Sequence, residues 1–343
     1  MPAWCVSRAV VAVGLVVGSK RHAGGFGGGF VAWDGRWYLT IAAHGYGGPP
    51  AAGQETSWPF FPLLPALLRG FRELPWPASL AMVLANHLLL ALALVGLWHL
   101  TNRRLGATAA SRAVWVLAVF PMSGVFSMLY PSAIFLAASV WAFELAERRR
   151  WGWCGALACA ATLVRPNGGL TAAVLVVVAL VTGGPERRWR RLLAVGGPSA
   201  VAVAAWIAVC AYRTGDPLVF LTAKAAWREH TLVELVRRLG SGADMGQVDV
   251  HALLGALSVV ALCVAWRWLP RSWRVLALAA LALPTVTGLV GLGRYANECF
   301  PLAIAGAVVL AAVPRAVRRL AIVSSLLAAC VAAASMASYQ LLP

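Results

Sequence analysis

Charged residues are scarce in this chain. Only 12% of its 343 residues are Asp, Glu, Lys or Arg, and its acidic residues number just 12, whereas a soluble domain carries about 25% charged residues. The chain is also 61% hydrophobic, so too few polar side chains remain to cover the outside of a water-soluble core. The composition excludes an ordinary soluble domain and indicates that the chain is solvated by lipid.

Several catalytic motifs are absent as well. The sequence contains no Walker A motif, no His-Glu-x-x-His, no Gly-x-Ser-x-Gly and no dinucleotide fingerprint. Its 7 cysteines are scattered through apolar runs without the spacing of a metal knuckle or a redox pair. No internal repeat of about 20–50 residues is visible. The sequence therefore implies no cofactor and no protein metal site, although a divalent metal ion is compatible with it.

The net charge of +17 does not indicate a nucleic-acid partner. The basic residues lie in short runs between apolar segments, as in the cytoplasmic loops of membrane proteins. These runs contain Arg103, Arg104 and Arg112, then Arg148 to Arg150, Arg187 to Arg191, Arg267 to Arg274 and Arg315 to Arg319, and Arg8 is counted with them. The positive-inside rule then places the N-terminus in the cytoplasm, although Lys20 and Arg21 oppose this orientation.

Eleven apolar segments are candidates for membrane-spanning helices, which need about 17–25 residues. They cover residues 4–19, 77–100, 113–129, 132–146, 151–164, 168–182, 192–211, 251–267, 275–291, 298–313 and 320–338. The pair 151–164 and 168–182 is either two short helices or one kinked or re-entrant element, because Pro166 interrupts it. We expect an all-α, multi-pass membrane protein with one domain over residues 1–343. Two long extracytoplasmic loops cover residues 20–76 and 212–250, and the first contains interfacial helices.

Every unusual polar segment falls on the predicted outer face. These segments are residues 33–38, 130–132, 165–167, 215–227 and 293–295. Because five separated segments share one side of the membrane, we expect them to form one composite site.

Asp34 is the central candidate of that site. It stands in Trp33-Asp34-Gly35-Arg36-Trp37-Tyr38, a short polar stretch of an otherwise apolar chain. One interpretation is a helix N-cap whose carboxylate accepts from backbone N–H groups. The other is a general base that takes the proton of an attacking hydroxyl. The two interpretations are compatible with each other.

The remaining candidates are substrate contacts, each with a structural alternative. Arg165 and Arg294 lie at the ends of apolar helices and either snorkel to the interface or hold a phosphate. His44 and Glu55 are acceptor or phosphate contacts, or ordinary loop residues. Lys224 is a further phosphate contact. Trp33, Arg36, Trp37, Tyr38, Asn167, Trp227 and Tyr295 complete the predicted binding set, although interfacial anchoring explains aromatic residues equally well.

The ordered motifs resemble the PIG-V family. The stretch from Trp33 to Tyr38 with Ile41-Ala42-Ala43-His44-Gly45-Tyr46 is similar to the first outer loop of that family, and Pro59 to Pro65 is similar to its Phe-Phe-Pro-x-x-Pro element. Arg165-Pro166-Asn167-Gly168 is similar to its Arg-Pro-x-Gly. The match continues with Gly215-Asp216-Pro217, Phe220, Trp227, Arg294-Tyr295 and Phe300-Pro301-Leu302. Tyr130-Pro131-Ser132-Ala133 departs from the family's Tyr-Thr-Glu-Ser and lacks its acid.

This resemblance implies a GT-C fold and a mannosyltransferase activity. It implies a polyprenyl-phosphate-linked sugar donor, inverting transfer on the extracytoplasmic face, and Asp34 as the base, with looser roles for His44, Arg165 and Arg294. The acceptor is a glycolipid or glycan that the resemblance does not identify. The composition is typical of a bacterial member in the plasma membrane. A lipid-linked-sugar flippase and a non-catalytic scaffold are the alternatives.

Overall fold

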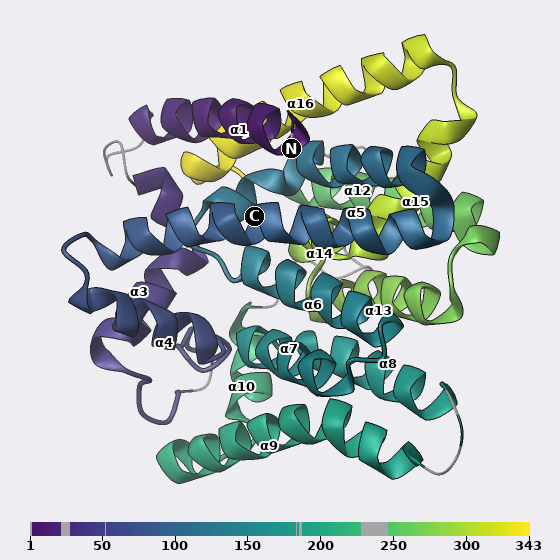
Figure 1. Ribbon diagram of the computed structural model, residues 1–343. Helices are drawn as coiled ribbons and strands as arrows, with labels where there is room; N and C mark the ends of the chain where they lie inside the picture. The colour runs from purple at the N-terminus through teal and green to yellow at the C-terminus, as the bar shows by residue number, and fades with distance from the viewer. Residues whose placement is uncertain (1, 22–27, 52, 183, 185–186, 228–245) are drawn as a thin grey trace.

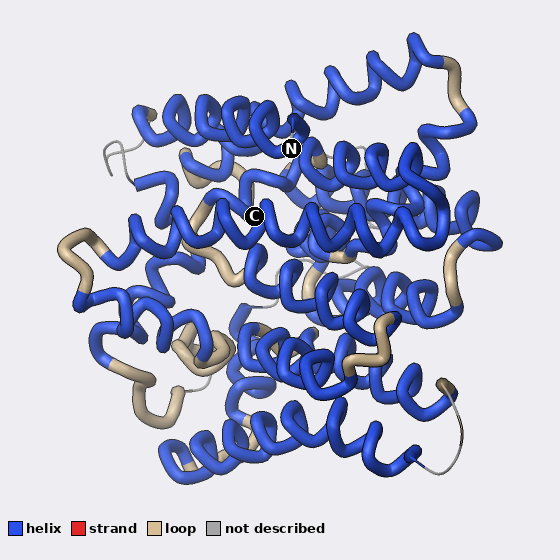
Figure 2. Tube along the Cα trace, viewed as in Figure 1, coloured by secondary structure: helices blue, strands red, loops and turns tan. Residues whose placement is uncertain are grey.

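The computed structural model describes all residues except 1, 22–27, 52, 183, 185–186 and 228–245. Within the described residues, the chain forms helices and loops and no strand (Figure 2). Most of the long helices lie side by side along one direction (Figure 1). The described part of the chain therefore has the all-α architecture that the sequence predicts.

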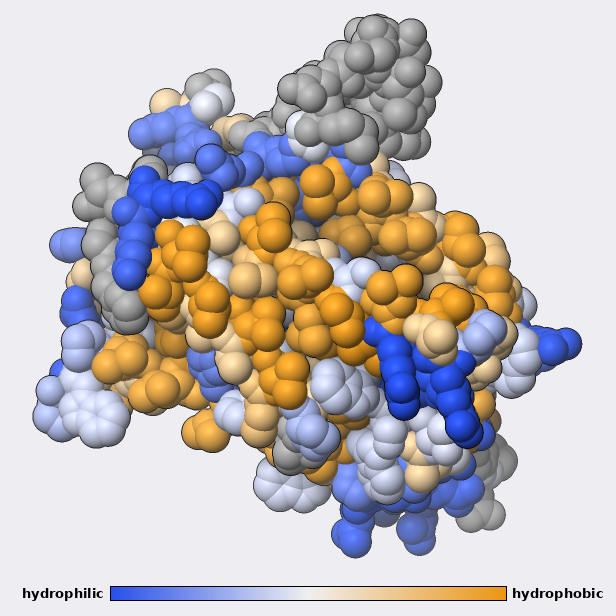
Figure 3. Space-filling model, turned by 90° about the horizontal axis from the view of Figure 1, so that it is seen from above, coloured by the Kyte–Doolittle hydropathy of each residue, from blue (hydrophilic) through white to orange (hydrophobic). Residues whose placement is uncertain are grey.

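Within the described residues, five helices are long and apolar enough to cross a membrane. They are α1 (Pro2–Lys20), α5 (Ala78–Val119), α9 (Arg188–Thr214), α12 (Gln247–Ala265), which the short helix η6 (Trp266–Trp268) extends, and α16 (Arg315–Ala337). Two bent pairs each meet the same criteria. One joins η3 (Pro121–Ser127) to α6 (Ser132–Glu147) at 99°, and the other joins η7 (Leu289–Gly291) and α14 (Leu292–Glu298) to α15 (Phe300–Ala312) at 75°. A broad apolar area covers the middle of the face shown in Figure 3, with hydrophilic residues toward its ends.

Each of the eleven predicted segments overlaps a helix, but several boundaries differ from the prediction. Segment 77–100 and residues 113–119 of the next predicted segment belong to one element, α5, which kinks at Gly106 with a φ of 83°. Its helical part ends at Val119 and not at residue 129, because Pro121 cannot continue the hydrogen-bond ladder. The predicted segment 275–291 is α13 (Arg271–Thr287), which ends where Gly288 takes a φ of 125°.

The two short segments form a helical hairpin. Helices α7 (Trp151–Val164) and α8 (Gly168–Val181) pack on each other and have 14 residues each. Each is therefore about 21 Å long, which is shorter than the hydrocarbon core of about 30 Å. The reversal depends on Gly168, because a Cβ atom there would lie 2.0 Å from the Ala161 carbonyl oxygen. The hairpin places Arg165 at its tip, inside the bundle.

Arg8 lies within the predicted helix 4–19, although the sequence counts its charge with the basic loops. It lies in α1 with only 5% of its surface exposed. Its guanidinium donates to the backbone carbonyls of Ser123 and Ala118 and to the hydroxyls of Ser123 and Ser127. A buried cation needs such partners because its hydration shell is lost. Arg8 thus fixes η3 against α1 and adds nothing to the charge of the basic loops.

Ion pairs gather part of the basic loops at one end of the bundle. The fully buried carboxylate of Glu144 pairs with Arg103 at 3.1 Å and with Arg148 at 2.8 Å. Arg104 pairs with Glu147 at 2.6 Å. These contacts join the end of α6 to the middle of α5, in agreement with the single face that the sequence predicts for these arginines.

The first long loop contains short helices, as expected. They are η1 (Gly29–Val31), α3 (Asp34–His44), α4 (Leu63–Gly70) and η2 (Phe71–Glu73). Helices α3 and α4 contact each other at the left side of the bundle in Figure 1. In the second long loop, α10 (Val219–Thr222) and η5 (Ala223–Trp227) are described, whereas residues 228–245 lie outside the described part.

Candidate active site

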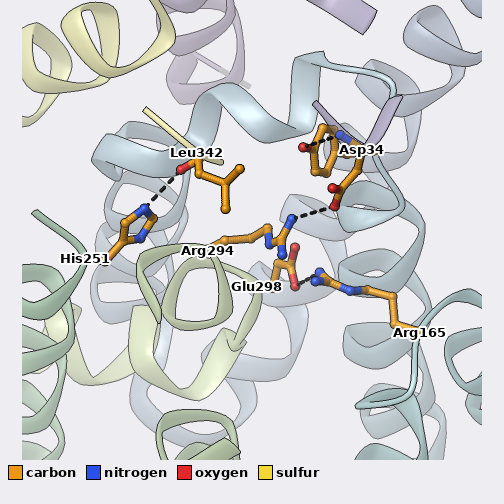
Figure 4. A network of polar contacts seen from close by, with 7 residues as sticks. Asp34, Arg165, His251, Arg294, Glu298 and Leu342 are labelled. Carbon is orange, nitrogen blue, oxygen red and sulfur yellow. Dashed lines mark hydrogen bonds and ion pairs between the residues drawn. The ribbon is translucent and has the colours of Figure 1, made fainter. Parts of the chain in front are cut away.

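Two ion pairs join three elements that are distant in sequence. Arg294 Nη1 of α14 lies 3.3 Å from Asp34 Oδ2 at the start of α3. Arg165, at the tip of the α7–α8 hairpin, pairs with Glu298 of α14. Figure 4 shows the Arg294 guanidinium close to both carboxyl groups, with Arg165 reaching Glu298 from the opposite side. The result is a compact network of two acids and two guanidinium groups.

Burial distinguishes the members of this network. The side chain of Asp34 is 26% exposed, that of Arg294 is 11% exposed and that of Glu298 is 1% exposed. Asp34 is therefore the acid that a substrate can reach, whereas Glu298 is enclosed. Charges at such depth are costly unless they are paired. The network is neutral as a whole, which explains how it is tolerated inside an apolar bundle.

Tyrosine rings surround the two guanidinium groups. The Arg165 guanidinium lies 5.1 Å from the ring centre of Tyr295, and that of Arg294 lies 5.8 Å from the same ring. Arg294 also lies 5.6 Å from the ring centre of Tyr130, whose hydroxyl accepts the backbone N–H of Asp34 at 3.0 Å. Burial raises the pKa of Tyr38, and the negative charge of Asp34 adds to the rise. The ring of Tyr295 thus lies beside both guanidinium groups, and Tyr130 contacts both Arg294 and the backbone of Asp34.

The backbone before Asp34 is strained. Trp33 has a φ of 58° and a ψ of −127°, which a bulky residue adopts only when its surroundings enforce it. Its indole N–H donates to the Met336 carbonyl at 3.0 Å, and its ring packs 5.2 Å from that of Tyr339. Helix α3 begins at Asp34, and no side chain caps it. The N-cap interpretation of Asp34 is therefore wrong, and its carboxylate faces Arg294 instead.

The C-terminal segment, from Met336 to Leu342, lies on both sides of the Asp34–Arg294 pair. Besides holding Trp33, it places Tyr339 5.0 Å from the guanidinium of Arg36. On the other side, the Leu342 carbonyl accepts from Nε2 of the buried His251 at 3.0 Å (Figure 4). The Nδ1 atom of the same ring accepts the N–H of Gly293, next to Arg294, at 3.2 Å. Because Nδ1 is an acceptor, His251 is neutral and has its proton on Nε2.

The other predicted residues lie at varying distances from the network. Lys224 is close enough to Tyr295 for an electrostatic interaction. Trp37 stacks on Phe60 with ring centres 5.7 Å apart, within the apolar cluster around α3. His44 and Glu55 are exposed. His44 ends α3, about 15 Å along the helix from Asp34. The roles of His44 and Glu55 stay predictions, and the Trp227 side chain lies outside the described part.

Glu298 is not among the predicted site residues, and Tyr130 is named only as part of a polar segment. Glu298 stands at the start of the apolar segment 298–313, where a lone acid is itself a signal because unpaired charges are rare in such segments. Tyr130 belongs to one of the five polar segments, but its hydrogen bond to Asp34 depends on the packing of η1 and α3 against the η3–α6 bend. Asn167 is buried near Glu298, and its Oδ1 has no partner.

The described residues bring together no group of three His, Cys, Asp or Glu side chains suited to a metal ion. The oxygens of Asp34 and Glu298 that have partners face guanidinium groups. The positive charge that a metal ion would supply to a phosphate is available here from Arg165 and Arg294.

Comparisons with known proteins define the fold. No family model and no curated protein matches the chain. Among solved structures, the apo oligosaccharyltransferase of Archaeoglobus fulgidus matches with a TM-score of 0.51 at 15% identity, covering 98% of this chain and 56% of that one. The oligosaccharyltransferase AglB of the same organism, in complex with an inhibitory peptide and a dolichol-phosphate, matches with a TM-score of 0.50 at 14% identity and the same coverage.

These likenesses show the fold of this chain, which is the GT-C fold of those oligosaccharyltransferases. The chain spans about half the length of the solved structures it matches. Together with the long apolar helices, the fold identifies an integral membrane protein.

Proposed function

We propose that this protein is a glycosyltransferase that moves a sugar, most simply a mannosyl residue, from a polyprenyl-phosphate donor to a hydroxyl of a glycolipid or glycan. The observation that carries the proposal is the contact between a partly exposed carboxylate, Asp34, and a guanidinium, Arg294, with Arg165 next to it. An acid beside two cations suits a reaction in which a hydroxyl loses its proton while a phosphate leaves.

The chemistry follows from the charges. The acceptor oxygen forms a bond to the anomeric carbon of the sugar as the bond from that carbon to the phosphate oxygen breaks, which inverts the configuration. Asp34 takes the hydroxyl proton, and the polyprenyl phosphate leaves with one more negative charge. Arg294 and Arg165 stabilise that charge, with fork-shaped donors that match phosphate oxygens. Such electrostatic stabilisation contributes several kcal/mol in a site of low polarity.

The surroundings suit a lipid-linked donor. The ion-pair network lies among helices that are apolar enough for a membrane, so a prenyl tail can remain in lipid while its phosphate reaches Arg294. AglB, which shares the fold, was solved with a dolichol-phosphate. The proposal includes a site on the extracytoplasmic face and a cytoplasmic N-terminus, and both rest on the basic loops. It also includes membership of the PIG-V family in a bacterial plasma membrane, which rests on the sequence motifs and the composition.

The test is transfer of radiolabelled mannose from polyprenyl-phosphate-mannose to lipid in membranes that contain the wild-type protein or Asp34→Asn. We expect a labelled product with the wild type only, and its analysis identifies the acceptor. Label movement across sealed vesicles without a new product would indicate a flippase. If several prenyl-linked sugars are tried as donors and none gives label in any fraction, the protein is not a transferase, and the scaffold interpretation remains.

A further inference from the structure

A small pocket with four buried polar residues in a mostly apolar lining lies behind the ion-pair network. Four of its lining residues, Ser139 of α6, Asn167 and Thr171 at the start of α8, and Glu298 of α14, form what we call the polar pocket, and Tyr295 borders it. Each of the four has a buried oxygen without a hydrogen-bond partner: Ser139 Oγ, Asn167 Oδ1, Thr171 Oγ1 and Glu298 Oε1. All four residues are at least nine-tenths buried. Four such atoms in residues that line one cavity point to a ligand in that cavity.

A buried polar atom without a partner costs about 1–3 kcal/mol, and four at one place would be a large cost for a marginally stable fold. The cavity has a volume of about 20 Å³, and about 10–15 Å³ is enough to hold a water molecule. The pocket is thus large enough for one oxygen atom with its hydrogens and too small for a sugar ring.

The charges select a neutral ligand. The other carboxylate oxygen of Glu298 is paired with Arg165, and Arg294 lies on the other side of Glu298 (Figure 4). A cation in the pocket would be repelled by both guanidinium groups, and an anion would be repelled by Glu298. The oxygens of Asn167 and Glu298 accept hydrogen bonds, whereas the hydroxyls of Ser139 and Thr171 both donate and accept. A hydroxyl-type oxygen matches this set.

We propose that the polar pocket binds one hydroxyl oxygen, which is a water molecule or a hydroxyl of the donor sugar, and that this ligand fixes Glu298 and, through it, Arg165. Glu298 is then a positioning residue, because it acts on the donor phosphate through Arg165. The sugar-hydroxyl form of the inference rests on the proposed transferase function, whereas the water form does not.

The first test needs no activity. A cryo-electron microscopy map of the donor-free wild-type protein, at a resolution that shows ordered waters, should contain one density within hydrogen-bond distance of Thr171 Oγ1 and Glu298 Oε1. A dry pocket in a map that shows waters elsewhere would overturn the proposal. A density with the short distances and higher coordination of a metal ion would also overturn it. If the transfer activity is absent, this test still decides the water form.

The second test uses Thr171→Val and Ser139→Ala, which remove the hydroxyls with little change of shape. The matched control is Thr162→Val on α7, because the Thr162 hydroxyl is buried but already donates to the Ala158 carbonyl of its own helix. We expect the donor KM of the two pocket variants to rise about tenfold, with a smaller change in kcat and in thermal stability. Thr162→Val should keep the wild-type KM.

Donors that lack single sugar hydroxyls distinguish the two sources. If water fills the pocket, Thr171→Val raises the KM of every deoxy donor by the same factor as the KM of the full donor. If a sugar hydroxyl fills the pocket, the deoxy donor that lacks this hydroxyl has a raised KM with the wild-type protein. Thr171→Val does not raise the KM of that donor any further. Either pattern supports the proposal. Wild-type KM values for both pocket variants with all donors would overturn the role of the pocket in holding Arg165.

Discussion

Arg294 and Asp34 are 260 positions apart in the chain, yet Arg294 Nη1 lies 3.3 Å from Asp34 Oδ2. Arg294 therefore occupies the carboxylate that we propose as the base when no donor is present. A donor phosphate must compete with Asp34 for the same guanidinium, which leaves Asp34 Oδ2 free for the acceptor hydroxyl. This contact ties the predicted base to the predicted phosphate ligand.

Asp34→Asn should reduce turnover by about 10²–10⁴-fold, the usual contribution of a general base. The amide keeps the size of the side chain but cannot take a proton. The measurement is the initial rate of sugar transfer with purified protein in detergent or nanodiscs. Glu73→Gln, which changes an exposed acid of η2, is the control and should retain the wild-type rate. Near-full turnover by folded Asp34→Asn would exclude Asp34 as the base.

Arg294→Ala should raise the donor KM by more than about tenfold, because one charge-assisted contact to phosphate contributes about 1.5–3 kcal/mol. The donor KM of Arg294→Lys should lie between those of the wild type and Arg294→Ala, since lysine keeps the charge and loses the forked geometry. Donor titrations at saturating acceptor measure the effect. Arg72→Ala removes an exposed arginine of η2 and should change nothing. An unaltered donor KM in Arg294→Ala would remove this residue from the phosphate site.

Glu298→Gln should lower the stability of the protein by about 3–5 kcal/mol, because it leaves the buried Arg165 without its counter-charge. The double variant Glu298→Gln/Arg165→Met should recover part of this loss, since no unpaired charge then remains. Thermal unfolding in detergent reports both. If the double variant were as unstable as the sum of the two single variants, the ion pair would not be the reason for the loss.

Gly168→Ala should destabilise the α7–α8 hairpin by about 1–3 kcal/mol, the usual cost of overpacking. The new Cβ atom would lie 2.0 Å from the backbone oxygen of Ala161, which cannot move without opening the hairpin. At the neighbouring Gly169, a Cβ atom would meet no other atom within 4 Å, so Gly169→Ala should be neutral or slightly stabilising. Unfolding temperatures of the two variants provide the comparison, and equal values would contradict the close packing.

The fold class was predictable because composition and hydropathy act along the chain. Apolar runs bounded by arginines predict helices in lipid whatever their partners are, and each of the eleven runs overlaps a helix. The predictions were wrong where one apolar segment packs against another. Nothing local distinguishes the end of α5 at Val119 from a continuing helix except Pro121, and nothing local shows that Arg8 turns into the bundle instead of facing water.

The site was predictable only in part. The sequence by itself determined an all-helical membrane chain, and it pointed to Asp34, Arg165 and Arg294 because charged side chains are expensive in apolar segments and are retained there with partners or a function. Which charge meets which was decided by the tertiary structure. The bend between α14 and α15, the hairpin at Gly168 and the strained Trp33 bring Glu298, Arg165 and Asp34 to one place, because hydrogen bonds and ion pairs depend on distances that only packing sets.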